Sequence, residues 1–213
     1  DIQLARLAKR LVDRHLVLFD CISCDKCIPV CPNDANFSYA TGPARIPQLT
    51  VRGTPEAPRF DREPDQVLEA THQIATFADF CNQCGNCDVF CPEEGGPYAI
   101  KPLFFGSEKH WRESADRDGF FITQEAVLGR IEGRHYRLDV SARAARFSGE
   151  GFEIELDLDD PESTLRGRWD RPVPLTWCFI MDLLRRSVLD TSHVNYVNMR
   201  WRKPSQTMGT NVS

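Results

Sequence analysis

The chain has 213 residues, of which 41% are hydrophobic and 27% are charged, a balance typical of a globular protein with one or two domains. No apolar run approaches the roughly 18 residues that suggest a membrane-spanning helix. The formal net charge of -5 argues against nucleic acid as the main partner.

Residues 1–16 are expected to form an amphipathic helix, because Leu4, Leu7, Leu11 and Val12 recur at helical spacing among charged residues. No basic stretch followed by an apolar one is present there, so no signal peptide is visible and we expect a cytoplasmic protein. The first residue is Asp rather than Met, which leaves the true N-terminus open. Residues 16–19 are expected to be a short strand that leads into a cysteine loop.

Two identical cysteine motifs, at 21–32 and 81–92, follow the pattern C-x2-C-x2-C-x3-C-P. Three thiolates at steps of three allow one short loop to wrap three corners of a cubane cluster. In two-cluster ferredoxins with this spacing, the fourth cysteine ligates the other cluster. We therefore predict two [4Fe–4S] clusters, one held by Cys21, Cys24, Cys27 and Cys91 and the other by Cys81, Cys84, Cys87 and Cys31.

Other interpretations of these cysteines are weaker. Zinc usually takes four ligands in two separated pairs and does not require the fourth cysteine with proline behind it. A disulfide framework is typical of short exported chains. A dry shell around the clusters is predicted from Ile22, Ile28, Val30, Val89 and Phe90. The ninth cysteine, Cys178, lies in an apolar stretch and is predicted to be a core residue rather than a ligand.

Between the motifs lies an insertion, residues 38–72, which we expect either to shield a cluster or to contact a partner. It includes a predicted strand at 46–51 and a predicted helical turn at 65–70, and a strand at 72–80 leads back to the second motif. Residues 100–105 are expected to be extended. After residue 119, short β-like runs at 120–122, 126–131, 135–140 and 152–158 predict a small antiparallel sheet, and 174–189 predict a helix packed on it.

Charge is distributed unevenly over the last third of the chain. The ionisable residues from 148 to 163 are all acidic, and basic residues gather after position 165. Both runs are interpreted as solvated faces, with docking of an oppositely charged partner as the alternative.

Markers of catalysis are missing from the sequence. There is no G-x-G-x-x-G loop, no P-loop and no H-E-x-x-H motif, and the five histidines show no metal-ligand spacing. We therefore predict no catalytic site in this chain, which leaves its role in an enzyme uncertain.

Residues 16–103 resemble two-cluster bacterial ferredoxins. A narrower resemblance rests on residues 32–36, on 80–92 with Gly96, Pro97, Tyr98 and Lys101, and on 118–121. These segments are similar to the C-terminal ferredoxin region of the family named "putative selenate reductase subunit", flavoproteins related to the glutamate synthase small subunit. In that family the ferredoxin follows a flavin- and NAD(P)-binding portion, which is absent from this sequence. The resemblance implies that electrons move between a flavin and a further acceptor.

The predicted fold class is α+β, with an N-terminal helix, a ferredoxin-like 2[4Fe–4S] module, and then a small antiparallel sheet plus helix. The predicted parts are the helix at 1–16, the ferredoxin module at 17–105, a β-rich domain with its helix at 106–190, and a basic tail at 191–213 that wraps a neighbour or frays. The predicted function is relay of single electrons through the two clusters, between a flavin- or NAD(P)H-linked donor and another redox centre of an oxidoreductase complex. A flavoprotein or other redox subunit is the expected partner. The alternatives are a structural or redox-sensing iron–sulfur protein, or a direct contribution to a catalytic site with bound flavin or metal.

Overall fold

The computed structural model describes residues 18–19, 21–93 and 96–199. The helix expected at 1–16 and the end of the basic tail lie outside these residues. The described elements, in chain order, are β1 (Asn36–Ala40), β2 (Ala44–Thr54), β3 (Ala57–Leu68), β4 (His72–Phe77), α2 (Asn86–Phe90), α3 (Pro97–Ile100), β5 (Leu103–Phe104), α4 (Glu108–Glu113), β6 (Gly119–Ile122), β7 (Ala126–Ile131), β8 (Arg134–Ser141), β9 (Ala144–Gly149), β10 (Phe152–Asp157), α5 (Pro161–Thr164), β11 (Arg166–Trp169), β12 (Val173–Pro174) and α6 (Leu175–Leu189).

A nine-stranded sheet organises the described part of the molecule, in the order β1-β4-β5-β6-β7-β8-β9-β10-β11. The strands from β6 to β11 form an antiparallel meander. The two-residue strand β5 joins this meander to the β1–β4 pair through parallel pairing with β4 on one side and β6 on the other. A second sheet has three strands in the order β12-β2-β3.

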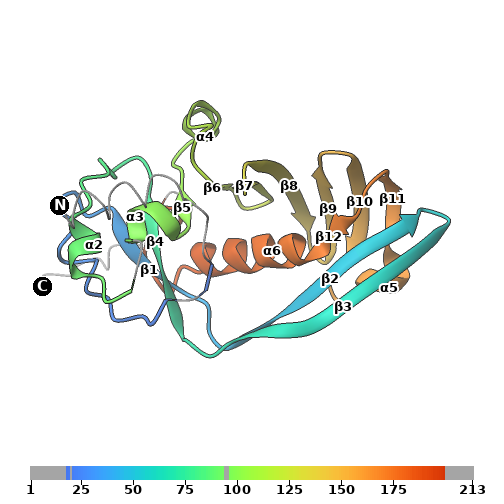
Figure 1. Ribbon diagram of the computed structural model, residues 1–213, viewed down its shortest axis with the longest axis horizontal. Coiled ribbons are helices and arrows are strands. Elements are labelled where there is room, and N and C mark those ends of the chain that lie inside the picture. Colours follow the sequence, from blue (N-terminus) through green and yellow to red (C-terminus); the bar gives the residue numbers. More distant parts are fainter. Residues whose placement is uncertain (1–17, 20, 94–95, 200–213) are drawn as a thin grey trace, which may run out of the picture.

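Helix α6 lies lengthwise between the two sheets, above the long β2–β3 hairpin in Figure 1, and contacts β1, β2, β7 and β8. Leu175, Cys178, Met181, Leu184 and Val188 recur every three or four residues, and each is 0% exposed. This stripe faces both sheets, and each large apolar side chain in it contributes about 1.5–3 kcal/mol by burial. The prediction that Cys178 is a core residue is confirmed.

The predicted fold class is wrong. The described chain is mostly β, and its main feature is one large sheet rather than a small α+β ferredoxin followed by a separate small sheet. The reason is the strand β5, which carries the hydrogen-bond ladder from the strands around the cysteine motifs into the meander. A two-residue strand leaves no periodic pattern in a sequence.

Individual elements agree better with expectation. The strands at 120–122, 126–131, 135–140 and 152–158 and the helix at 174–189 are present within a residue or two. The helical turn expected at 65–70 is wrong, because residues up to Leu68 belong to β3. Strands β2 and β3 pair over nearly their whole length, with a register shift between Ile46 and Gln48, so the insertion is mainly a long hairpin.

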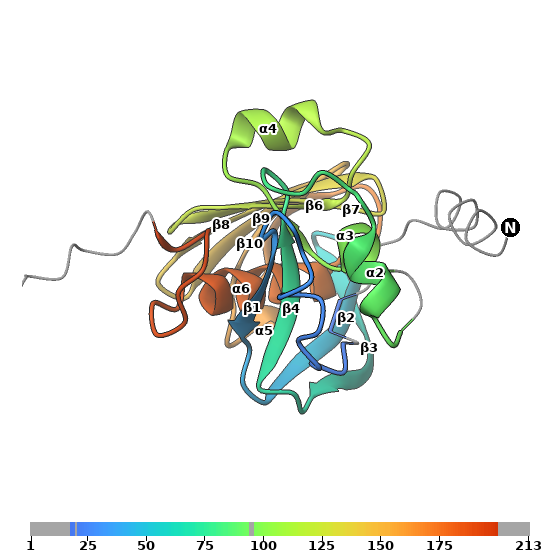
Figure 2. The same cartoon turned by 90° about the vertical axis from the view of Figure 1, so that its left-hand side faces the viewer.

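Arg130 holds the segment that carries α4 against the sheet, where Figure 2 shows α4 standing above β6 and β7. Its side chain is only 1% exposed. The guanidinium donates to the carbonyl oxygens of Ser114 and Arg117, each at 2.7 Å, and of Trp111 at 3.0 Å. Its Nε also donates to His135 Nε2 at 3.0 Å. One buried cation thus satisfies three carbonyls at the end of a short helix.

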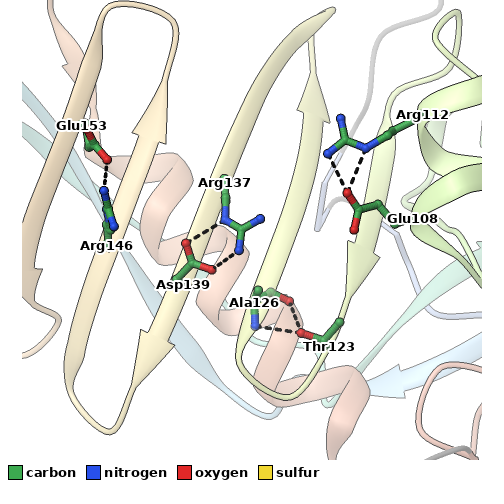
Figure 3. Close-up of polar contacts among 8 residues, drawn as sticks. All are labelled: Glu108, Arg112, Thr123, Ala126, Arg137, Asp139, Arg146 and Glu153. Carbon is green, nitrogen blue, oxygen red and sulfur yellow. Dashed lines mark hydrogen bonds and ion pairs between the residues drawn. The ribbon is translucent and has the colours of Figure 1, made fainter.

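The exposed face of the meander carries ion pairs between neighbouring side chains (Figure 3). Arg137 pairs with Asp139 at 2.6 Å, and Glu153 pairs with Arg146 and, at 2.7 Å, with Arg168. Glu150, Asp159 and Glu162 of the acidic run also pair with arginines of this chain. Exposed pairs contribute only about 0–1 kcal/mol each. Much of the acidic run is thus neutralised within the chain, which favours the interpretation as a solvated face.

The described residues after α6 pack back toward the cysteine motifs. The Tyr196 ring lies 5.3 Å from that of Phe77 and 4.9 Å from that of Phe80, while Asn195 and Asn198 are buried. The predicted tail is therefore anchored up to residue 199, rather than frayed. No helix in the described ranges is long and apolar enough to cross a membrane.

Candidate cluster-binding site

The two cysteine loops lie at one end of the nine-stranded sheet, the first before β1 and the second after β4 and through α2 (Figure 1). The burial of the cysteines repeats from motif to motif. The second cysteine of each motif, Cys24 or Cys84, is exposed, and the third, Cys27 or Cys87, is 6% exposed. The first and fourth cysteines of both motifs are partly buried: Cys21, Cys31, Cys81 and Cys91. No cysteine is in a disulfide in the structure.

The backbone of the two loops also repeats. Ser23 (φ 54°) and Gln83 (φ 56°), each preceding a second cysteine, are left-handed, as are Asp25 (φ 58°) and Gly85 (φ 75°), which follow it. Left-handed backbone costs a non-glycine residue roughly 1–2 kcal/mol. Such turns direct successive N–H groups into a concavity, a nest that binds anions and is found at many iron–sulfur sites.

Hydrogen bonds from the loops reach the sulfur atoms. The backbone N–H of Ser23 donates to Cys21 Sγ at 3.4 Å. The corresponding bond in the second loop runs from the backbone of Gln83 to Cys81 and lowers the pKa of Cys81, although burial, the larger effect, raises it. The N–H of Ala35 donates to Cys31 Sγ at 3.2 Å. These donors stabilise thiolates.

The electrostatic couplings run between the sulfurs of the two motifs. The pKa of Cys27 is raised to about 12, mainly by burial and to a lesser degree by the charges of Cys21, Cys87 and Cys91. The pKa of Cys21 is raised by burial and also feels Cys91. Burial also raises the pKa of Cys81 and Cys87, and the charge of Cys31 raises both further, while that of Cys84 acts on Cys81. Because Coulomb interactions weaken with distance, Cys91 lies near the first motif and Cys31 near the second.

Thiols with raised pKa values stay protonated unless a cation compensates their charge. A coordinated metal deprotonates a thiol outright, and the thiolate is the ligand form. Among the described residues, no three His, Cys, Asp or Glu side chains converge as they would on one metal ion. Ligands of a single zinc ion all lie about 2.0–2.3 Å from it, whereas a cubane takes each thiolate at a different iron. Eight cysteines in two C-x2-C-x2-C-x3-C-P motifs are the donor set that fits [4Fe–4S] clusters.

One polar side chain, Asn36 at the start of β1, connects the two motifs. Its Nδ2 donates to the Cys27 carbonyl at 2.9 Å, and its amide also bonds to Cys87, where it lowers the thiol pKa against the effect of burial. The Thr76 hydroxyl on β4 donates to Asn36 Oδ1 at 2.8 Å. Asn36 is 3% exposed and Thr76 is 0% exposed. The sheet thus fixes both loops through one buried amide.

Further bonds attach the first loop to the start of β4. Ser23 Oγ donates to the His72 carbonyl at 2.8 Å, and the His72 ring bonds to Asp25 at 2.9 Å. The side chain of Asn86, at the start of α2, donates to the Val30 carbonyl. Sequence reasoning did not identify any of these positioning residues, because each polar residue sits singly in a loop or strand.

Two cations lie beside the sulfur groups. Lys101 has a side chain only 3% exposed, with its Nζ 3.7 Å from Glu93, and it lowers the pKa of Cys21. Arg117 lowers the pKa of Cys81. Each group of thiolates therefore has one compensating positive charge from beyond its own loop.

The predicted dry shell is only partly present. Ile28 and Val30 pack against the small cluster of Cys27, Ile74 and Cys87. Ile22, Val89 and Phe90 are 61%, 68% and 50% exposed. In α2 a single helical turn buries the residues at 87 and 88, so the next two residues face outward.

Tyr39 on β1 carries a buried hydroxyl that has no hydrogen-bond partner in the structure. The residue is 1% exposed, and its pKa is raised by burial and by the charge of Cys21. Leaving such a hydroxyl unpaired costs about 1–3 kcal/mol. The ring packs edge-on against Phe104 in the main core, on the face of β1 opposite Asn36.

Comparison with known proteins agrees with the cysteine pattern. Residues 17–94 match the model of the "4Fe-4S dicluster domain". The chain is 29% identical over 137 residues, 64% of its length, to "Putative oxidoreductase YgfK" of Escherichia coli strain K12 and to the protein of the same name in strain O157:H7. The chain spans about a tenth of the length of these relatives. No solved structure matches. The chain therefore contains a ferredoxin-like iron–sulfur segment and is distantly homologous to these proteins.

Proposed function

We propose that this chain, with its ferredoxin-like iron–sulfur segment, is an electron-relay part of an oxidoreductase. The observation that supports the proposal is the pair of C-x2-C-x2-C-x3-C-P motifs, which lie in the segment that matches the dicluster domain and which the fold brings together at one end of the large sheet. We propose that Cys21, Cys24, Cys27 and Cys91 hold one [4Fe–4S] cluster, and that Cys81, Cys84, Cys87 and Cys31 hold the other. When bound, such clusters supply one-electron redox chemistry.

The positions of the cysteines suit a relay. Cys27 and Cys87 are buried against Ile74 in one small core cluster, so the inner sides of the two ligand groups adjoin. Cys24 and Cys84 are exposed, one in each group. Each group therefore has a surface side that a donor or acceptor can approach and an inner side that faces the other group.

The loops and their neighbours prepare the site for this role. The N–H groups of the nests and the charges of Lys101 and Arg117 favour negative charge at the sulfurs. Hydrogen bonds to sulfur and the burial of a cluster are among the factors that set its reduction potential. The chain thereby tunes the potential while keeping the ligands rigid.

The partners are proposed from similarity. The resemblance to the selenate reductase subunit family and the name "oxidoreductase" of the relatives support a flavin- or NAD(P)H-linked donor and a second redox centre. The relatives are about ten times longer than the matched region. A flavoprotein or other redox subunit is the partner that we propose.

Iron and sulfide analysis of anaerobically purified protein tests the cofactor content first. We expect about eight iron and eight sulfide per chain, and two interacting S = 1/2 EPR signals after reduction with dithionite. The control is Cys178→Ala, which removes a cysteine outside both motifs and leaves the iron content unchanged. Zinc, or an iron content that none of the motif cysteines affects, contradicts the proposal.

Stopped-flow spectroscopy then separates a relay from a structural iron–sulfur protein. Photoreduced flavin mononucleotide serves as the donor and oxidised cytochrome c as the acceptor. In a relay, the donor bleaches the visible absorbance of the clusters and the acceptor restores it, each within seconds. Clusters that stay oxidised under the same conditions indicate a structural role instead.

A further inference from the structure

A cavity of about 340 Å³ lies beside the second cysteine loop. Its volume falls within the roughly 300–1,000 Å³ that small-molecule sites usually have. The lining comes from Gln83 in that loop, from side chains between 98 and 103, and from the turns at 115–118 and 132–133. None of the motif cysteines lines the cavity, so it is distinct from the cluster-binding site.

Tyr98 on α3 forms the wall between the cavity and the sulfurs. Its ring packs against the small core of Cys27, Ile74 and Cys87. A Cβ atom built at Gly85, in the second loop, would lie 3.9 Å from the Tyr98 hydroxyl. Together with Ala99, Leu103 and Ala115, this ring makes much of the lining apolar.

Arg117 brings a positive charge to the opposite side of the cavity. Its backbone is fixed, because its N–H donates to the Ser114 carbonyl at 3.1 Å and its own carbonyl accepts from Arg130 at 2.7 Å. The Nη2 atom of Arg117 is buried and has no hydrogen-bond partner among the described residues. Buried polar groups normally have a partner. Lys101, which is 3% exposed, is the second cation of the lining.

The acidic residues of the lining do not supply this partner. Both carboxylate oxygens of Asp118 accept from backbone N–H groups, those of Glu132 at 2.7 Å and Gly133 at 3.0 Å. Asp116 and Glu132 are exposed, where water and salt screen their charges. The guanidinium of Arg117 is therefore the donor group that can take an acceptor from outside the chain.

We propose that this cavity binds a small molecule with an apolar body and one anionic group, a carboxylate or a phosphate, that pairs with Arg117. The planar guanidinium matches both anions, because its N–H groups can bond to two of their oxygens at once. Tyr98 and Leu103 offer the apolar surface for the body, and Lys101 adds a second positive charge. The binding goes beyond the proposed electron relay and requires no electron transfer.

Isothermal titration calorimetry of the anaerobically purified chain, at physiological ionic strength, tests this inference. The probes are benzoate and phenyl phosphate, which share an aromatic body and differ in the anionic group, so the tighter of the two identifies that group. Benzamide has the shape of benzoate without its charge and is the control probe. We expect saturable one-to-one binding of an anionic probe and none of benzamide.

Arg117→Met should weaken the binding about tenfold or more, because charge-assisted hydrogen bonds are lost. Ala115→Trp is the second variant, since Ala115 is an exposed residue of the lining and a large side chain there obstructs the cavity while Arg117 stays in place. Arg134→Met is the matched control, because Arg134 is exposed and follows Gly133 but does not line the cavity. Iron analysis of each variant separates loss of the clusters from loss of binding.

Binding of either anionic probe that weakens in Arg117→Met and in Ala115→Trp, and persists in Arg134→Met, supports the inference. It is overturned if neither anion binds, if benzamide binds as tightly as benzoate, or if binding survives either of the two cavity variants. If Arg117→Met does not fold, Ala115→Trp decides alone.

Discussion

Asn36 is the residue whose replacement tests the architecture of the site most directly. Asn36→Ala removes the buried amide that joins Cys27, Cys87 and Thr76. The Cys27 carbonyl and the fully buried Thr76 hydroxyl then lose a partner, and each orphaned group costs about 1–3 kcal/mol. At about 2 kcal/mol each, the free energy of unfolding should fall by roughly 4 kcal/mol. Guanidinium denaturation of the anaerobic protein measures this loss, and iron analysis measures cluster retention.

Asn33→Ala provides a matched control. Asn33 is exposed and lies three residues before Asn36 in the same segment. Exposed substitutions of this kind usually change stability by less than about 0.5 kcal/mol, and the iron content should not change. If Asn36→Ala were as stable as Asn33→Ala and kept its full iron content, the buried amide would not position the loops and the account of the site given above would be wrong.

Three other predictions concern the ligands and the sheet. Cys91→Ser should damage the cluster of the opposite motif, seen as loss of the EPR signal assigned to the Cys21 group; an unchanged signal would refute crossed ligation. Arg130→Met should lower the free energy of unfolding by about 3–5 kcal/mol, because three carbonyls lose their donor, whereas Arg112→Met, at an exposed ion pair, should cost under about 1 kcal/mol. The pKa of His135 is lowered by burial and then by the charges of Arg130 and Arg112. Protonation of His135 is therefore less favourable in the folded chain than in the unfolded chain, where its pKa is 6.5. The free energy of unfolding is highest above pH 6.5 and falls as the pH drops below that value. Denaturation midpoints between pH 7 and 5 should show a small loss that His135→Gln abolishes.

The iron–sulfur character of residues 17–94 could be predicted from the sequence, because ligand spacing is local. Motif residues at steps of three place thiolates on one loop whatever the rest of the chain does. The helix at 174–189 was also predictable, since its apolar stripe repeats at helical spacing over four turns. Both predictions needed only neighbours in sequence.

Long-range pairing limited the prediction of the fold. Residues 57–68 include Pro58 and Pro64 and are mostly polar, and they are extended because β2 pairs with them. The strand Leu103–Phe104 exists only because β4 and β6 flank it. In both places tertiary pairing overrode local propensity.

The positioning residues of the site were hidden for a related reason. Asn36 begins a five-residue strand, and nothing in the sequence distinguishes a polar side chain that bonds to a loop from one that faces water. Only the burial of Asn36 and its hydrogen bonds reveal its surroundings.

The hairpin inserted between the motifs has a consequence for biosynthesis. Residues of β2 bond to residues more than 120 positions later in the chain. The N–H of Leu49 donates to Thr176 Oγ1 at 2.9 Å, and Val51 pairs with Val173. Contacts of such sequence separation form late, after the intervening chain exists. On the ribosome, both cysteine motifs emerge well before α6, yet the hairpin between them cannot dock until α6 has been made. The folded cradle is therefore completed only after α6 has been made, and nascent chains would expose reduced cysteines to oxygen until then.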